Sequence, residues 1–61
     1  MEFQVLFHQG NQRYYWRIDA SNGRVLASSE AYFNRQDCYN AVSVVKTYAG
    51  TARVVDATKA A

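Results

Sequence analysis

Tyr14–Tyr32, which reads YYWRIDASNGRVLASSEAY, has the pattern of two β-strands joined by a tight turn. Asn22 and Gly23 lie between two runs of alternating residues, and Asn-Gly is the dipeptide that a two-residue type I′ turn prefers. Such a turn fixes the register of the two strands. The predicted pairs are Ser21 with Arg24, Ala20 with Val25, Asp19 with Leu26, Ile18 with Ala27, Arg17 with Ser28 and Trp16 with Ser29.

Alternation then separates the side chains of this hairpin into an apolar face and a polar face. The apolar face is expected to carry Trp16, Ile18, Ala20, Val25 and Ala27. The polar face is expected to carry Arg17, Asp19, Ser21, Arg24 and Ser28. A slip of one residue would mix the two sets, so the pattern favours this register.

The residues before this hairpin predict a further strand on the same apolar face. Glu2 to His8 alternates with the period of a half-buried strand, and Gly10-Asn11 follows with Gly first, as a type II′ turn requires. This turn pairs Phe7 with Tyr14, Val5 with Trp16 and Phe3 with Ile18. Both turns agree on one buried face, which predicts a three-stranded antiparallel meander.

After Glu30 the apolar residues recur with the period of a helix. Asn34 is expected to cap the helix together with Asp37, with Phe33 packed on Cys38. The apolar stripe comprises Cys38, Ala41, Val42, Val45, Tyr48 and Ala49. Gly50 is expected to end the helix in a left-handed conformation, and Thr51–Asp56 predicts a fourth strand. The sequence therefore predicts an α+β unit, β-β-β-α-β, with the helix on the apolar face.

Length and composition predict one small domain that needs a second stabilising element. A chain of 61 residues buries only about 60% of its unfolded surface. One cysteine excludes an internal disulfide, and one histidine with one cysteine cannot complete a four-ligand zinc site. We therefore expect self-association, with the domain over 1–56 and a disordered tail over 57–61.

The chain shows no signal for a membrane or for secretion. It has no run of 18 apolar residues, no basic leader followed by an apolar segment, and no lipidation motif. We therefore expect a cytoplasmic protein without a membrane partner. The formal charge of +2 is a mild basic bias that nucleic-acid-binding proteins share with many others.

Several of these runs resemble the YegP-like family, a small bacterial domain of unknown function. The resemblance extends over about residues 3 to 56 and is carried by YWRI from Tyr15, ASNG from Ala20, ASSE from Ala27 with Tyr32, VVK from Val44 and ARVVD from Ala52. The family pattern usually has Gly at the position of Ala31. The resemblance implies a β-β-β-α-β unit that occurs in pairs, builds one continuous sheet and exchanges its C-terminal strands. For this single copy it implies a homodimer that exchanges Thr51–Asp56, with Ala52, Val54 and Val55 in the exchanged strand.

The loop between the predicted third strand and the helix holds the side chains that most resemble catalytic ones. Ser28, Ser29, Glu30 and Tyr32 lie close together, but no nucleophile elbow or local histidine accompanies the serines. One interpretation is a loop that satisfies its own backbone while Tyr32 packs at the sheet edge. The alternatives are a ligand contact or a small hydrolase that uses Ser29 or Glu30.

Two other residues with reactive side chains are expected to be structural. His8 pairs with Arg13 on the polar face, where no carboxylate orients the imidazole as a base, so it is interpreted as a surface histidine. Cys38 lies on the apolar face of the helix and is interpreted as a small buried hydrophobe.

The polar side of the sheet is the best candidate for a binding surface. It is expected to present Arg13, Tyr15, Arg17 and Arg24, and arginine mixed with tyrosine suits phosphate and stacked bases. Glu2 and Asp19 share this face and offset part of its charge. The alternative is an ordinary solvated face.

The function expected from these patterns is a dimeric interaction or accessory domain without catalytic activity. The sequence predicts no catalytic set, no cofactor and no metal site. An alternative is a protein that binds single-stranded nucleic acid or another polyanion through the arginine and tyrosine face. A hydrolase that uses the Ser-Ser-Glu loop is the third hypothesis.

Overall fold

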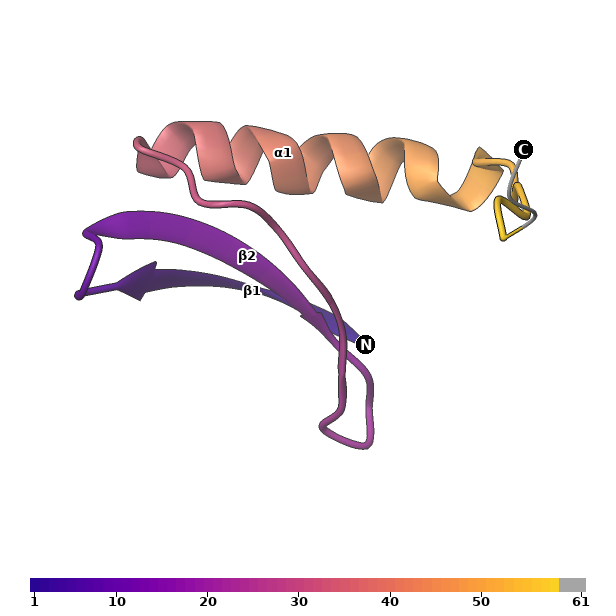
Figure 1. Cartoon of the computed structure of the whole chain (residues 1–61), viewed down its shortest axis with the longest axis horizontal. Helices are drawn as coiled ribbons and strands as arrows, with labels where there is room; N and C mark the ends of the chain where they lie inside the picture. Colours follow the sequence, from indigo (N-terminus) through magenta and orange to yellow (C-terminus); the bar gives the residue numbers. More distant parts are fainter. Residues whose placement is uncertain (59–61) are drawn as a thin grey trace.

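The computed structural model describes residues 1–58, which form three strands, one helix and a short 3-10 turn. The elements are β1 (Glu2–His8), β2 (Arg13–Asp19), β3 (Val25–Ser28), α1 (Arg35–Tyr48) and η1 (Ala49–Thr51). The strands form one antiparallel sheet in the order β1-β2-β3. Figure 1 shows α1 lying along one side of this sheet, reached by a connection that runs back past β2. The α+β class and the meander are therefore confirmed.

The pairing of β1 with β2 is the one that the alternation predicts. Phe3 lies opposite Ile18, Val5 opposite Trp16 and Phe7 opposite Tyr14. Aromatic rings meet across this pair, with centroids 6.0 Å apart for Phe3 and Trp16 and 5.0 Å apart for Phe7 and Tyr14. Such tilted aromatic pairs add to the stability gained from burial.

The turn between β1 and β2 differs from the predicted one. Gly10 has no positive φ, and Gln12 instead takes the left-handed conformation with φ 53°. The connection therefore uses the four residues between His8 and Arg13 rather than a type II′ turn with Gly first. Four-residue loops keep the same strand register as a centred two-residue loop, which is why the predicted pairs survive.

The turn between β2 and β3 is also of another type. The Gly23 amide donates to the Ala20 carbonyl at 2.9 Å, and the Ala20 amide donates to the Arg24 carbonyl at 2.8 Å. Gly23 alone has a positive φ, 86°, whereas a type I′ turn would require one at Asn22 as well. The predicted type I′ turn is therefore wrong, and a three-residue loop with a glycine bulge joins the strands.

A second irregularity restores the predicted register farther along β3. Ile18 pairs with Ala27 and Arg17 with Ser28 as predicted, but Asp19 pairs with Val25 instead of Leu26. Opposite residues in an antiparallel pair share a face, so Val25 lies on the side of Asp19. Its side chain is 55% exposed, and its predicted place on the apolar face is wrong.

The helix begins where the sequence predicts but ends differently. Asn34 is the N-cap residue, yet its side chain donates to the Asp37 carboxylate at 3.2 Å and makes no capping bond. Gly50 has no left-handed φ, and η1 continues the helix as a 3-10 turn. The predicted stop at Gly50 is therefore wrong.

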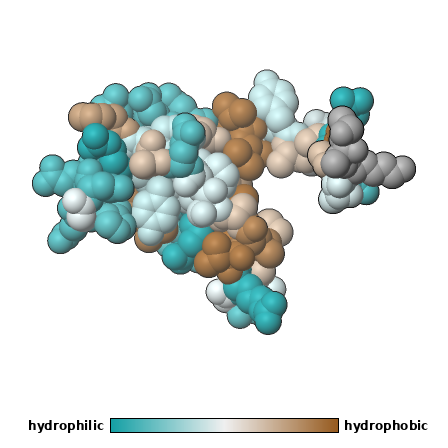
Figure 2. Space-filling model, in the orientation of Figure 1, coloured by the Kyte–Doolittle hydropathy of each residue, from teal (hydrophilic) through white to brown (hydrophobic). Residues whose placement is uncertain are grey.

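α1 packs on β1 and β2 along one side of the sheet. Its first residue, Arg35, has a raised pKa, chiefly because of its hydrogen bond to the Tyr39 hydroxyl and in part because of Tyr14 on β2. Cys38 is fully buried, as predicted, and it is the one buried residue among residues 1–58. Figure 2 shows hydrophobic side chains that remain on the surface over α1 and beside the end of the sheet.

The last predicted strand is not formed within this chain. Thr51 closes η1, and the residues from Ala52 to Thr58 form no strand. Thr58 donates to the Asp56 carboxylate from its amide at 3.0 Å and from its hydroxyl at 2.6 Å. Residues 59–61 of the predicted tail lie outside the described part of the chain. In residues 1–58 no helix has the length and apolar character that a membrane crossing requires.

Candidate functional site

A hollow of about 260 Å³ opens at the hairpin end of β1 and β2. We call it the basic hollow, and its lining residues are His8, Asn11, Arg13, Tyr15, Ser29 and Ala31. It unites three groups that the sequence treats separately: the surface histidine, part of the predicted arginine and tyrosine face, and the serine loop.

The His8 ring is held in place by the turn that follows it. Its Nδ1 accepts a hydrogen bond from the Asn11 amide at 3.3 Å, which leaves the ring proton on Nε2 in the neutral form. The ring also covers Gly10, where an added Cβ would lie 2.8 Å from His8 Cε1. A Cβ at residue 10 would force the His8 ring to move, so Gly10 leaves room for the ring, while its backbone angle is one that any residue can adopt.

Arg13 is fixed without a carboxylate partner. Its Nη1 donates to the carbonyl oxygens of Asn11 at 3.1 Å and Gln12 at 3.3 Å. The guanidinium carbon lies 4.0 Å from the centre of the Phe33 ring, a cation–π contact. The sequence predicts Phe33 on Cys38 instead, but its side chain is 73% exposed and covers Arg13. These contacts restrain the side chain without neutralising it.

Ser29 has a structural position at the side of β2. Its hydroxyl accepts from the Trp16 amide at 2.9 Å and donates to the Glu30 carbonyl at 2.7 Å, while its amide donates to the Trp16 carbonyl at 2.9 Å. Tyr32 then pairs with Tyr14 through two backbone hydrogen bonds of 2.9 and 2.7 Å. The loop thus extends the edge of the sheet, and the Ser29 proton is donated to a carbonyl.

Three of the four residues of the predicted polyanion face share one side of β2 by alternation, and Arg24 does not join them. Arg13 and Tyr15 line the basic hollow. Arg17 forms a two-pronged ion pair with Asp19, with N–O distances of 2.7 and 3.1 Å, and this contact raises the pKa of Arg17. Arg24 lies opposite Ala20 because the loop contains three residues instead of two. Opposite residues share a face, so Arg24 lies on the side of Ala20 and not on the side of Arg17.

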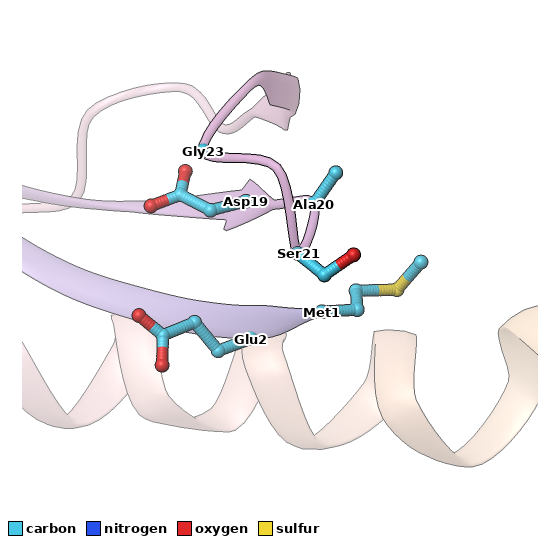
Figure 3. A pocket seen from close by; sticks show the side chains of 6 residues that line it. All are labelled: Met1, Glu2, Asp19, Ala20, Ser21 and Gly23. Carbon is cyan, nitrogen blue, oxygen red and sulfur yellow. The ribbon is translucent and has the colours of Figure 1, made fainter.

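A second hollow, of about 330 Å³, lies at the opposite end of the same strands. Figure 3 shows its lining residues, Met1, Glu2, Asp19, Ala20, Ser21 and Gly23. Glu2 and Asp19 are cross-strand partners, so this end of the sheet is acidic where the other end is basic. Among residues 1–58, no three His, Cys, Asp or Glu side chains are placed to share a metal ion.

The residues predicted for the exchanged strand are exposed. Val54 is 98% exposed and Val55 is 68% exposed. Ala52 has the extended backbone angles φ −68° and ψ 141°. Valine is among the residues most often buried in folded proteins. This segment therefore presents apolar surface that nothing within residues 1–58 covers.

Comparison with known proteins gives consistent matches across most of the chain. The model of a family described as a domain of unknown function, DUF1508, matches residues 10–56. A UPF0339 protein of Neisseria meningitidis serogroup B is 32% identical over 47 residues, covering 77% of this chain and 82% of that protein. A UPF0339 protein of Methanosarcina acetivorans is 32% identical over 54 residues, covering 88% and 91%.

A solved structure is also similar to this chain. The NMR solution structure of a protein from Haloferax volcanii superposes on this chain with a TM-score of 0.80 at 32% sequence identity. The match covers 92% of this chain and 93% of that one. The similarity thus reaches both the sequence and the arrangement of the elements.

Proposed function

Since this chain belongs to the DUF1508 family of domains of unknown function, the family that its YegP-like motifs indicate, we propose that it acts as a homodimeric interaction domain without catalytic activity. In this proposal each subunit adds its residues 51–56 to the sheet of the other. The dimer is the functional unit, and its assembled surface contacts further partners.

The exposed C-terminal segment carries this proposal. Val54 and Val55 are 98% and 68% exposed on a backbone that is already extended at its start. Full burial of a valine stabilises by roughly 1.5–3 kcal/mol. A chain whose one buried residue among 1–58 is Cys38 has much to gain from a second copy.

The free edges of the sheet offer a place for the exchanged segment. β1 and β3 are the two edges, and β1 has seven residues in regular register whereas β3 has four and is interrupted by the shift near Leu26. Bulges and short lengths discourage the addition of strands, and a long regular edge favours it. We therefore propose β1 as the acceptor of the partner's segment.

The geometry of the serine loop supports a non-catalytic role. The Ser29 hydroxyl both accepts from and donates to the backbone, so its hydrogen bonds serve the sheet edge. A nucleophilic serine requires a base as the acceptor of its proton. His8 lines the same hollow, but its Nδ1 accepts from Asn11.

Light scattering coupled to size-exclusion chromatography tests the proposal. We expect a species of about twice the 6.9 kDa chain mass at micromolar concentration. Val54→Pro removes an amide from the exchanged strand and should shift the protein towards monomer. Ala57→Pro, placed beyond the strand, is the matched control and should stay dimeric. A monomeric parent protein would refute the dimer, and a dimeric Val54→Pro variant would refute exchange of this segment.

A further inference from the structure

We propose that the basic hollow binds the phosphate group of a small phosphate monoester. This site lies within one chain and goes beyond the proposed dimer. The reasons are its charge, its fixed donors and its size.

The residues that line the basic hollow do not compensate its charge, and the one acid next to them in the chain is Glu30, between Ser29 and Ala31. His8 and Arg13 lie directly opposite each other, and none of the six lining residues is acidic. The paired acids of the sheet, Glu2 and Asp19, lie at the far end of β1 and β2. Six residue steps along a strand separate the two ends, which is about 20 Å and beyond a Debye length at physiological salt.

Three residues offer hydrogen-bond donors around this charge. Arg13 uses Nη1 for the turn carbonyls, and its Nε and Nη2 groups form no hydrogen bond within residues 1–58. His8 has Nε2 free once Nδ1 accepts from Asn11. Tyr15 follows Arg13 by two residues on the same face, about 7 Å along the strand, and brings its hydroxyl.

The donors are held before any ligand arrives. Phe33 and two carbonyls restrain Arg13, and the hydrogen bond from the Asn11 amide orients the His8 ring. Restraint of the binding groups lowers the entropy lost when a ligand is bound. Arg17 differs in this respect, because its guanidinium is already paired with Asp19.

The number of donors and the volume favour phosphate on a small molecule. A carboxylate is saturated by the fork of one arginine, whereas a tetrahedral phosphate has further oxygens for the imidazole and the phenol. The hollow of about 260 Å³ is below the usual range of drug-sized sites, about 300–1,000 Å³. It therefore suits the phosphate of a compact monoester better than a large cofactor.

Titration of the ¹⁵N-labelled full chain, followed by amide NMR spectra, tests this site. Inorganic phosphate should produce saturable shifts in the turn after β1, at Arg13 and Tyr15, and around Ser29. Adenosine monophosphate is the monoester probe, acetate is the carboxylate probe, and a short oligothymidylate presents phosphodiesters. We expect both phosphate probes to bind and acetate to bind about tenfold more weakly.

Matched variants separate the site from general attraction of anions. Arg13→Gln should weaken phosphate binding about tenfold, whereas Arg24→Gln removes the same charge elsewhere and should leave it unchanged. The spectra also report whether Arg13→Gln is folded, and Tyr15→Phe offers a milder second variant with a severalfold loss. Shifts without saturation, or equal losses in Arg13→Gln and Arg24→Gln, would overturn the proposal. Tighter binding of the oligonucleotide than of the monoester at these residues would assign the site to nucleic acid instead.

Discussion

The Ser29 hydroxyl accepts a hydrogen bond from the Trp16 backbone amide at 2.9 Å, in a place where a sheet usually supplies a backbone carbonyl. The Ser29 amide returns a bond to the Trp16 carbonyl. Ser29, the first residue after β3, thus forms hydrogen bonds with both the amide and the carbonyl of Trp16. The architecture of the sheet edge therefore explains Ser29 of the Ser-Ser-Glu motif.

Ser29→Ala should destabilise the fold because it leaves the half-buried Trp16 amide without its acceptor. We expect a loss of about 1–2 kcal/mol in the free energy of unfolding. Ser28→Ala, at the exposed neighbouring position, is the control and should change stability by less than about 0.5 kcal/mol. Urea unfolding followed by Trp16 fluorescence measures both, and equal stability of the two variants would contradict the assigned role.

Gln12→Gly should stabilise the first hairpin. Gln12 has φ 53°, a left-handed conformation that costs a residue with a Cβ more than it costs glycine. We expect a gain of about 0.5–1 kcal/mol, after allowance for the greater freedom of glycine in the unfolded chain. Gln9→Gly, in the same loop without a positive φ, should instead be slightly destabilising. Thermal unfolding would disprove the conformational reason if both variants moved in the same direction.

Gly23→Ala and Gly50→Ala should have opposite effects. Both positions have open space around an added Cβ, but only Gly23 has a left-handed φ, 86°. Gly23→Ala therefore isolates the backbone cost and should destabilise by roughly 1–2 kcal/mol. Gly50→Ala should be neutral or stabilising by up to about 1 kcal/mol, because its backbone is acceptable to alanine. A large loss at Gly50 would restore the left-handed helix stop that the sequence predicts.

The sequence predicts correctly those features that depend on a pattern repeated over many residues. The register of β1 and β2 follows from alternation over seven residues, so the wrong turn type at Gly10 did not disturb it. The turn at Asn22-Gly23 depends on a few local dihedral angles, and there the three-residue loop replaced the two-residue one. The sequence assigns Val25 and Arg24 to the wrong faces of the sheet. The loop is one residue longer than predicted, and one extra residue exchanges the two faces for the residues that follow it.

The basic hollow was beyond the reach of sequence patterns because its parts come from separate segments. Alternation places Arg13 and Tyr15 on one face, but nothing in it indicates that Phe33 folds over Arg13 or that Ser29 reaches the same hollow. The sequence instead predicts Phe33 on Cys38, so no sequence signal pointed to its contact with Arg13. The last strand, Thr51–Asp56, stays a prediction that depends on a second chain.

The Cys38 thiol should make stability fall at alkaline pH. Burial raises the pKa of this thiol above its ordinary value, because the folded protein disfavours the charged thiolate. As pH rises towards and past about 9, the unfolded chain therefore releases the thiol proton more readily than the folded chain does. The folded state then binds more protons than the unfolded state, so the free energy of unfolding decreases as pH rises.

We expect a loss of up to about 1 kcal/mol between about pH 7.5 and pH 9.5 from this group. Cys38→Ala removes the titrating group and should lower stability at both pH values through the lost packing, but with a smaller slope. The slope, unlike the absolute stability, separates the titration from the cavity. Urea unfolding at the two pH values measures it, and an unchanged slope in Cys38→Ala would show that another group causes the alkaline loss.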